Sequence, residues 1–386
     1  MKLRYLALIG LTLITFVSQD IWVTYSPILT NVSSLTGTSV SYLGFLAISY
    51  PVLFLILTIP SGILLDRNFK LWLSFGAIIT MVGGVFRILS PSNYLWLFFF
   101  QLLGGIGQPF LLNAFAPFAS KYYEKNKPLI ISILSFSMYL GTIYSLAVGT
   151  YLYKLGGLYL VFLPTSIMAI FGIVLYLFGI KSIENKRSIE NIKLLNEMKY
   201  AIKQKNLWLL GIVLGLGVAT FDNISTWLQP VLNTVGMGNI SGTVVAFTMI
   251  IGLIGIMIFP NIVAMKNLRT IYLRIIVILI FLFFISLAFE ISRTALYVLL
   301  PISGFLMLPA YPIIMEWISK FYDKSRQGIA SGFMALVSRV FSVIFTVFAV
   351  FVIMNVTSYF VYLAILILGA SIFTFLLPKD KGISVL

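Results

Sequence analysis

Four charged side chains stand inside long apolar stretches of this sequence, and they are the residues best suited to do chemistry there. They are Asp20, Asp222, Glu316 and Arg339. A charge at the centre of a bilayer costs roughly 2.5–3.5 kcal/mol even on insertion scales, so such a residue faces a partner or an aqueous cavity. Three acids against one base leave a surplus of negative charge. That surplus suits a cationic solute, exchangeable protons, or both.

Each of these residues also has a purely structural interpretation. Asp222 or Glu316 can pair with Arg339 between neighbouring helices, and Asp20 can be a protonated or hydrogen-bonded acid within a helix bundle. The chain contains neither histidine nor cysteine, which excludes imidazole proton relays, disulfides and thiolate metal sites. We therefore expect no metal, no cofactor and no enzymatic activity, and any coupling chemistry must use carboxylates.

Aromatic side chains accompany the first acid, in the stretch VSQDIWVTYSPILT. Trp22 and Tyr25 follow Asp20 within the same apolar run, and an aromatic face attracts an organic cation. Both can equally be core or interfacial aromatics. In another apolar run, Gln108 carries a polar amide just before Pro109, where a helix kink would expose backbone carbonyls.

The composition identifies the elements that must position these residues. Of the 386 residues, 60% are hydrophobic and only 10% are charged, and the mean hydropathy is +1.06. These values are typical of a polytopic membrane protein, whose partner is the lipid bilayer. Twelve segments are long enough to cross about 30 Å of hydrocarbon as helices. They lie near 4–30, 39–65, 71–89, 94–122, 129–153, 158–180, 207–233, 241–265, 270–289, 294–320, 328–354 and 357–377.

The basic residues predict the orientation of these helices. The net charge is +15, but the lysines and arginines gather in the short loops on one side of the predicted threading. This is the pattern of cytoplasmic loops, so we set nucleic acid aside and place both termini in the cytoplasm of a plasma-membrane protein. Little beyond Arg87, Lys154 and Arg293 lies on the other side. Arg87, near the outer end of its segment, is expected to snorkel toward the interface.

The chain repeats itself in two halves. TFDNISTWLQPVLNTV around Asp222 echoes the stretch around Asp20, and SKYYEK at residue 120 returns as SKFYDK at residue 319. Two echoes at nearly one offset imply duplication. We predict an all-α protein with a six-helix bundle over residues 1–180, a cytoplasmic basic linker over 181–206 and a second six-helix bundle over 207–386. The linker is either an amphipathic helix on the membrane surface or a plain connection.

The loop after the second segment carries a recognisable motif, GILLDRNFK. Gly62, Asp66, Arg67 and Lys70 in this loop resemble the major facilitator signature. Physically, Gly62 would allow close helix packing, while Asp66 would sit at a helix N-terminus or pair with a basic residue to latch a cytoplasmic gate. The alternative is an ordinary basic loop with a helix-capping aspartate. The corresponding loop of the second half has no acid, so the latch would be one-sided.

Longer strings resemble the feline leukaemia virus receptor-related branch of the major facilitator superfamily. The strings are WVTYS from Trp22, GQPFLL from Gly107, Phe221 with Ile224-Ser225-Thr226, Glu316, Ser331-Gly332, and Val340-Phe341 with Ile344-Phe345-Thr346. Members of that branch transport choline and ethanolamine, and haem has been proposed. The resemblance implies an organic cation or amine in a central aromatic site.

The resemblance also implies roles for single residues. Trp22 would be the aromatic wall, with Gln108 and Glu316 as polar contacts. Asp222 stands where the branch has a tyrosine, and Arg339 stands where it has a glutamine.

The sequence therefore predicts a secondary active or facilitative transporter. It would move a small organic solute by alternating access between two bundles, as in the major facilitator fold. By the resemblance the solute is a choline-like cation or amine, and proton coupling is the candidate energy source. The competing hypothesis is a non-transporting receptor or sensor that binds a small ligand on the same scaffold.

Overall fold

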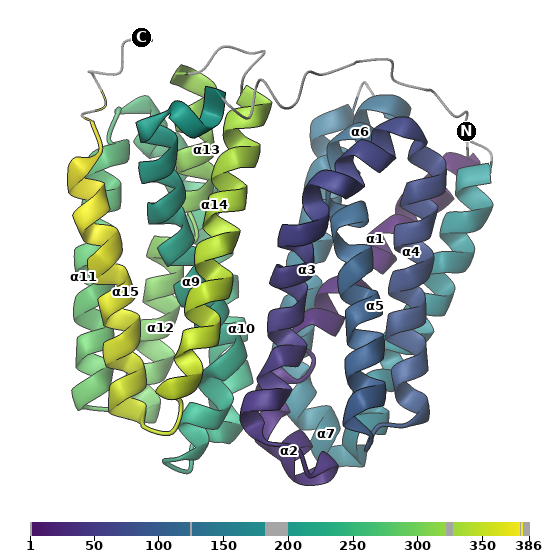
Figure 1. Cartoon of the computed structure of the whole chain (residues 1–386), viewed down its shortest axis with the longest axis horizontal. Coiled ribbons are helices and arrows are strands. Elements are labelled where there is room, and N and C mark those ends of the chain that lie inside the picture. The colour runs from purple at the N-terminus through teal and green to yellow at the C-terminus, as the bar shows by residue number, and fades with distance from the viewer. Residues whose placement is uncertain (1, 124–125, 182–199, 322–326, 379, 381–386) are drawn as a thin grey trace. The chain divides into compact units, whose positions relative to one another are not determined.

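The computed structural model describes residues 2–123, 126–181, 200–321, 327–378 and 380, and they are helical without a strand (Figure 1). The chain forms two compact units, Met1–Glu190 and Asn191–Leu386, here called unit 1 and unit 2. The prediction of an all-helical chain is therefore confirmed. Most of the predicted linker falls on residues 182–199, outside the described residues.

Three long helices of unit 1 begin at polar residues whose side chains cap them. The side chain of Ser39 accepts a hydrogen bond from the Tyr42 amide. Asn68 and Asn93 each accept a hydrogen bond in the same way from the amide three residues later, at the starts of the next two long helices. Such caps satisfy amides that have no partner inside the helix. The elements are α1 (Lys2–Val23), η1 (Ser26–Ile28), α2 (Leu29–Thr36), α3 (Val40–Arg67), α4 (Phe69–Phe86), η2 (Arg87–Leu89), α5 (Tyr94–Leu112), α6 (Phe115–Tyr122) and α7 (Lys127–Lys181).

Helix α7 is two helices joined by a tight turn. Gly157 has φ +62°, a conformation that glycine adopts at little cost. Ser137, before the turn, donates a hydrogen bond of 2.6 Å to the carbonyl of Thr12. Tyr176, after the turn, lies against Gly10, where a Cβ would meet its backbone. In one straight helix Ser137 and Tyr176 would be about 60 Å apart, so both halves fold back onto α1.

Unit 2 has the same order of long and interrupted helices. The tenth predicted segment of the chain, 294–320, lies in unit 2 and is divided at Pro309, which has no backbone N–H to donate. The fourth predicted segment, in unit 1, is also divided, between α5 and α6, but the break there falls at Asn113 and Ala114 and contains no proline. The elements of unit 2 are α9 (Lys205–Asn233), η4 (Gly238–Ile240), α10 (Ser241–Met265), α11 (Arg269–Phe289), α12 (Arg293–Met307), α13 (Ala310–Phe321), α14 (Gln327–Phe348), η5 (Ala349–Phe351) and α15 (Val356–Leu376).

Eleven helical segments of the described residues are long and apolar enough to cross a membrane. One of them, Leu129–Lys181, is folded back at Gly157 and so supplies two crossing segments. The structure thus agrees with the twelve segments predicted from the sequence, six in each unit.

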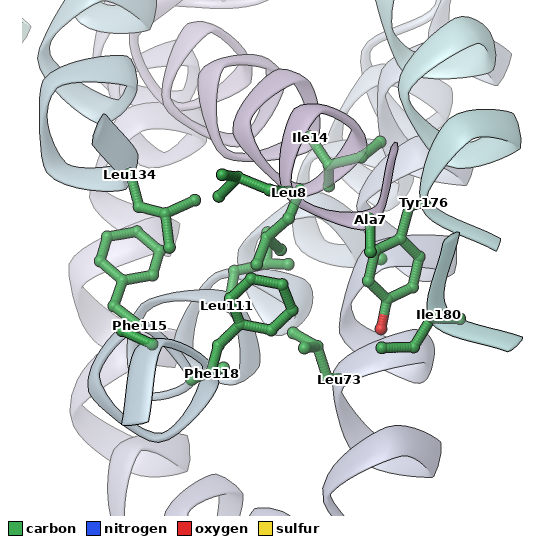
Figure 2. Packing of buried hydrophobic residues seen from close by; sticks show 14 of the residues in the cluster. Ala7, Leu8, Ile14, Leu73, Leu111, Phe115, Phe118, Leu134, Tyr176 and Ile180 are labelled. Carbon is green, nitrogen blue, oxygen red and sulfur yellow. The ribbon is translucent and has the colours of Figure 1, made fainter. Parts of the chain in front are cut away.

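The core of unit 1 is organised around α1, because every other long helix contributes buried side chains to the cluster at its N-terminal half. Figure 2 shows Ala7, Leu8 and Ile14 of α1 facing side chains of four other helices. The labelled partners are Leu73, Leu111, Phe115, Phe118, Leu134, Tyr176 and Ile180. With its apolar half fixed in this way, α1 holds its polar second half at a defined place inside the unit.

Candidate functional sites

The carboxylate of Asp20, near the end of α1, is held by two other helices of unit 1. Its Oδ2 lies 3.5 Å from Nη2 of Arg87 in η2 and accepts a hydrogen bond from the hydroxyl of Thr165 in α7. Ser145, in the first half of α7, donates a hydrogen bond of 3.3 Å to the backbone carbonyl of Asp20. The acid is therefore ion-paired and hydrogen-bonded inside the bundle.

Arg87 corrects one prediction, because it does not snorkel. Its side chain is 0% exposed and reaches into unit 1. Nη1 donates a hydrogen bond of 2.9 Å to the hydroxyl of Thr24, and the guanidinium carbon lies 4.5 Å from the ring centroid of Phe162. A charge with these partners is stabilised inside the bundle, so it has no need to reach the interface.

Unit 2 repeats this arrangement with one difference. Asp222 of α9 is the counterpart of Asp20, and its Oδ2 accepts a hydrogen bond from the hydroxyl of Ser342 in α14. The same oxygen lies 3.4 Å from Nη1 of Arg339, also in α14. The side chain of Asp222 is only 4% exposed, as Asp20 is, but that of Arg339 is 30% exposed. The Asp20–Arg87 pair is therefore fully buried, whereas in the Asp222–Arg339 pair the arginine is partly exposed.

Glu316 forms an ion pair with Arg269, a partner that the sequence did not indicate. Its two carboxylate oxygens accept hydrogen bonds of 2.5 and 2.8 Å from Nε and Nη2 of Arg269, the first residue of α11. The amide of Arg269 also donates a hydrogen bond of 2.5 Å to Asp380, whose carboxylate lies 3.6 Å from the guanidinium. The loop before α11 contains no acid. The two acids that meet Arg269 come instead from α13 (Glu316) and from the segment after α15 (Asp380).

These three groups remove the predicted surplus of negative charge. The predicted surplus set three acids against Arg339 alone, but Arg87 pairs with Asp20 and Arg269 pairs with Glu316. Among the described residues, every acid of the predicted set is therefore within 4 Å of an arginine. The charge count by itself no longer favours a cationic solute.

The predicted aromatic and amide contacts all lie in unit 1. Trp22 is half-buried, and its indole N–H donates a hydrogen bond of 3.1 Å to the carbonyl of Ala47 in α3. Tyr25 is 1% exposed and packs edge-on against Phe162, with ring centroids 6.0 Å apart. Gln108 is buried in α5. Of the two aromatic residues, only Trp22 is partly exposed.

The GILLDRNFK motif follows the expected position but not all of the expected roles. No atom lies within 4 Å of a Cβ built on Gly62, so close helix packing at this glycine is ruled out among the described residues. Asn68, not Asp66, caps α4 by accepting a hydrogen bond from Leu71 N at 3.3 Å. Asp66 is exposed at the end of α3 and acts electrostatically on Lys121 of α6. Arg67 is exposed and Lys70 is half-buried.

Sequence reasoning missed three residues that hold these groups in place. Arg87 and Arg269 were read as loop or interface charges, although an arginine inside the apolar run 71–89 was a usable signal. Gln101, in α5, donates hydrogen bonds of 3.0 Å to the carbonyls of both Ile21 and Leu46. No spacing in the sequence distinguishes it from Gln108.

Comparison with known sequences gives a family. A family model described as Major Facilitator Superfamily matches residues 11–346. An uncharacterised protein of Archaeoglobus fulgidus is 26% identical over 178 residues, which cover 45% of this chain and 81% of that protein.

Solved structures share the fold over nearly the whole chain. A D-xylose–proton symporter has a TM-score of 0.73 at 15% identity, covering 99% of both chains. A bacterial homologue of the human lysosomal transporter Spinster, inward-facing and unoccupied, has a TM-score of 0.75 at 14% identity, covering 98% of this chain and 96% of that one. The nucleoside transporter NupG, as its D323A mutant, has a TM-score of 0.74 at 13% identity, covering 97% and 100%.

Proposed function

Because the chain belongs to the Major Facilitator Superfamily, we propose that it carries a small organic solute across the plasma membrane by alternating access, with both termini in the cytoplasm. The observation that supports this best is the pairing of two six-helix units whose first helices each hold a carboxylate–arginine pair inside the apolar segment. Charges at such depth are characteristic of solute and ion pathways. The protein is a transporter and not an enzyme.

The solute we propose is an organic amine, with choline and ethanolamine as first candidates. The support is the resemblance of the stretch around Trp22 together with the state of that residue. Its indole N–H is already bonded to Ala47, so the ring is fixed, and the residue is only half-buried. A fixed aromatic face attracts an organic cation by roughly 0.5–2 kcal/mol, more as water is excluded.

For the energy source we propose proton coupling through a carboxylate. Asp20 and Asp222 are the acids within the spans of the two first helices, and each also accepts a hydroxyl hydrogen bond. With no histidine in the chain, a proton carried through the protein would bind a carboxylate.

Uptake by purified protein in liposomes tests the proposal. Radiolabelled choline or ethanolamine should enter protein-containing vesicles faster than empty ones, and an imposed inward proton gradient should raise the rate. Counterflow against preloaded unlabelled solute separates this from the receptor hypothesis, because a receptor binds without counterflow. Binding without any uptake would exclude transport of these solutes and favour the receptor.

A further inference from the structure

We infer that unit 1 binds an internal water molecule beside the Asp20–Arg87 pair, held by the phenols of Tyr25 and Tyr50, and that this water delivers a proton to Asp20. The delivery of the proton rests on the proposed proton coupling, whereas the water site itself does not. All the residues that carry the inference belong to unit 1.

The first step is a set of buried polar atoms that have no hydrogen-bond partner in the described part of the chain. The set includes the hydroxyls of Tyr25 and Tyr50 and Nε of Arg87, and these three residues are only 0–1% exposed. Buried polar atoms in proteins are nearly always hydrogen-bonded, either to the protein or to an internal water. Because a buried donor without a partner is costly, three of them together indicate a bound polar molecule.

The second step is that these three atoms belong to one cluster. Tyr25 and Tyr50 both interact electrostatically with Arg87, and Tyr50 also interacts with Asp20 and Tyr25. The ring of Phe162 packs against two members of the cluster. Its centroid lies 4.5 Å from the guanidinium carbon of Arg87 and 6.0 Å from the ring centroid of Tyr25. Polar groups that face each other without a direct hydrogen bond are those that a water can bridge.

The third step is the space that the sequence provides for the hydroxyl of Tyr50. Tyr50, in α3, belongs to one buried apolar cluster with Val17 and Ile21, which flank Asp20 on α1. Its hydroxyl lies over Gly104 of α5, where an added Cβ would collide with the oxygen. A larger residue at position 104 would displace the phenol, because the interior is closely packed. The glycine therefore admits this hydroxyl to the interior of unit 1.

The fourth step is the charge of the cluster, which selects a neutral molecule. Asp20 and Arg87 form an ion pair, so their charges balance, and an added ion would be a buried charge without an opposite partner. Water is neutral and small. It needs roughly two to four polar partners, and the two phenols, Nε of Arg87 and the carboxylate of Asp20 provide them.

Such a water gives a fully buried acid a proton donor. A water protonated from the aqueous phase passes its extra proton to a carboxylate oxygen of Asp20 and remains as water, and the reverse step returns the proton. Arg87 keeps its hydrogen bond to Thr24 throughout. None of the titratable partners of Asp20 in the described part of the chain is a second carboxyl, so Asp20 takes the proton. Those partners are Arg87, Tyr25, Tyr50 and Tyr144.

Radiolytic labelling tests the water site without any solute. X-ray pulses on the full chain in lipid nanodiscs generate hydroxyl radicals from bound water, and mass spectrometry locates the side chains that they oxidise. Tyr25 and Tyr50 should be oxidised about tenfold faster than Tyr176, because water lies beside them. Tyr176 is the matched control, since it is 0% exposed and its phenol forms a hydrogen bond of 3.2 Å with Ser74. Tyr50→Phe should slow the oxidation of Tyr25 several-fold. Either phenol as inert as Tyr176 would overturn the site.

Uptake in liposomes tests the proton role. Tyr25→Phe combined with Tyr50→Phe should lower the uptake of radiolabelled ethanolamine driven by a proton gradient about tenfold, because the route to Asp20 is lost. Counterflow at equal pH on both sides should stay close to that of wild type, and Tyr176→Phe should change neither rate. Undiminished gradient-driven uptake in the double variant would overturn the proton role. If wild type shows the labelling but no gradient-driven uptake, the proposed proton coupling is rejected and the water site stands.

Discussion

Nη2 of Arg87 lies 3.5 Å from Oδ2 of Asp20, and the two side chains are 0% and 4% exposed. Their helices are far apart in sequence, so this pair ties the end of α4 to the end of α1. Breaking one side of a buried ion pair leaves an unpaired charge and costs about 3–5 kcal/mol, while replacing both sides by neutral groups can cost much less.

Asp20→Asn should therefore lower the thermal stability of the detergent-purified protein substantially, as should Arg87→Gln. The double variant should be more stable than the sum of the single losses predicts, which is the signature of a direct interaction. Exposed Asp66→Asn serves as the control and should melt as wild type does. Strict additivity of the two single changes would mean that the pair contributes no coupling.

Asp66 offers a test of gating. If its charge sets the balance between conformations through basic partners such as Lys121, Asp66→Asn should slow uptake roughly tenfold while changing solute affinity little, because the pocket itself is untouched. The measurements are initial uptake rates in liposomes and equilibrium binding. Glu290→Gln, an exposed acid that follows α11, is the matched control. An unchanged uptake rate in Asp66→Asn would mean that the GILLDRNFK motif is an ordinary basic loop with no role in gating.

Trp22 is the residue to change in a test of the proposed aromatic contact with an organic amine. Trp22→Ala should weaken the binding of an organic amine by about 0.5–2 kcal/mol, and Trp22→Phe by less, since a phenyl ring keeps part of the cation–π attraction. Binding affinity is measured directly by calorimetry or by competition with a labelled amine. Trp208→Ala, an exposed tryptophan near the start of α9, should leave affinity unchanged. Equal affinity in wild type and Trp22→Ala would remove the aromatic contact from the proposal.

The proposed orientation can be read by thiol labelling, because the natural chain contains no cysteine. Single cysteines at Ser92 and Asn239, both exposed, should react with an impermeant maleimide added to intact cells. Cysteines at Asn126 and Lys266, also exposed, should react only after the membrane is opened. The opposite pattern would reverse the threading.

The sequence by itself determined the class, the fold and the number of crossing segments. Apolar runs of about twenty residues have one stable solution in a bilayer, a helix whose backbone groups are all satisfied internally. For that reason composition and length were sufficient, and even the turn in α7 was predicted, because the predicted segments 129–153 and 158–180 end on either side of it. The duplicated strings then gave the division into two halves.

Only the tertiary structure decided how the charged residues are paired. Asp20 and Arg87 are 67 residues apart, and Asp222 and Arg339 are 117 apart, so their contacts depend on how helices pack and rotate. Periodicity gives the face of a helix but not the neighbour it meets. Counting acids against one base therefore predicted a negative site, whereas packing gave each acid an arginine and left Arg339 as the basic partner open to solvent. The physical reason is that a buried charge has no water to solvate it and therefore needs an opposite charge beside it. Which charges are buried depends on how the helices pack.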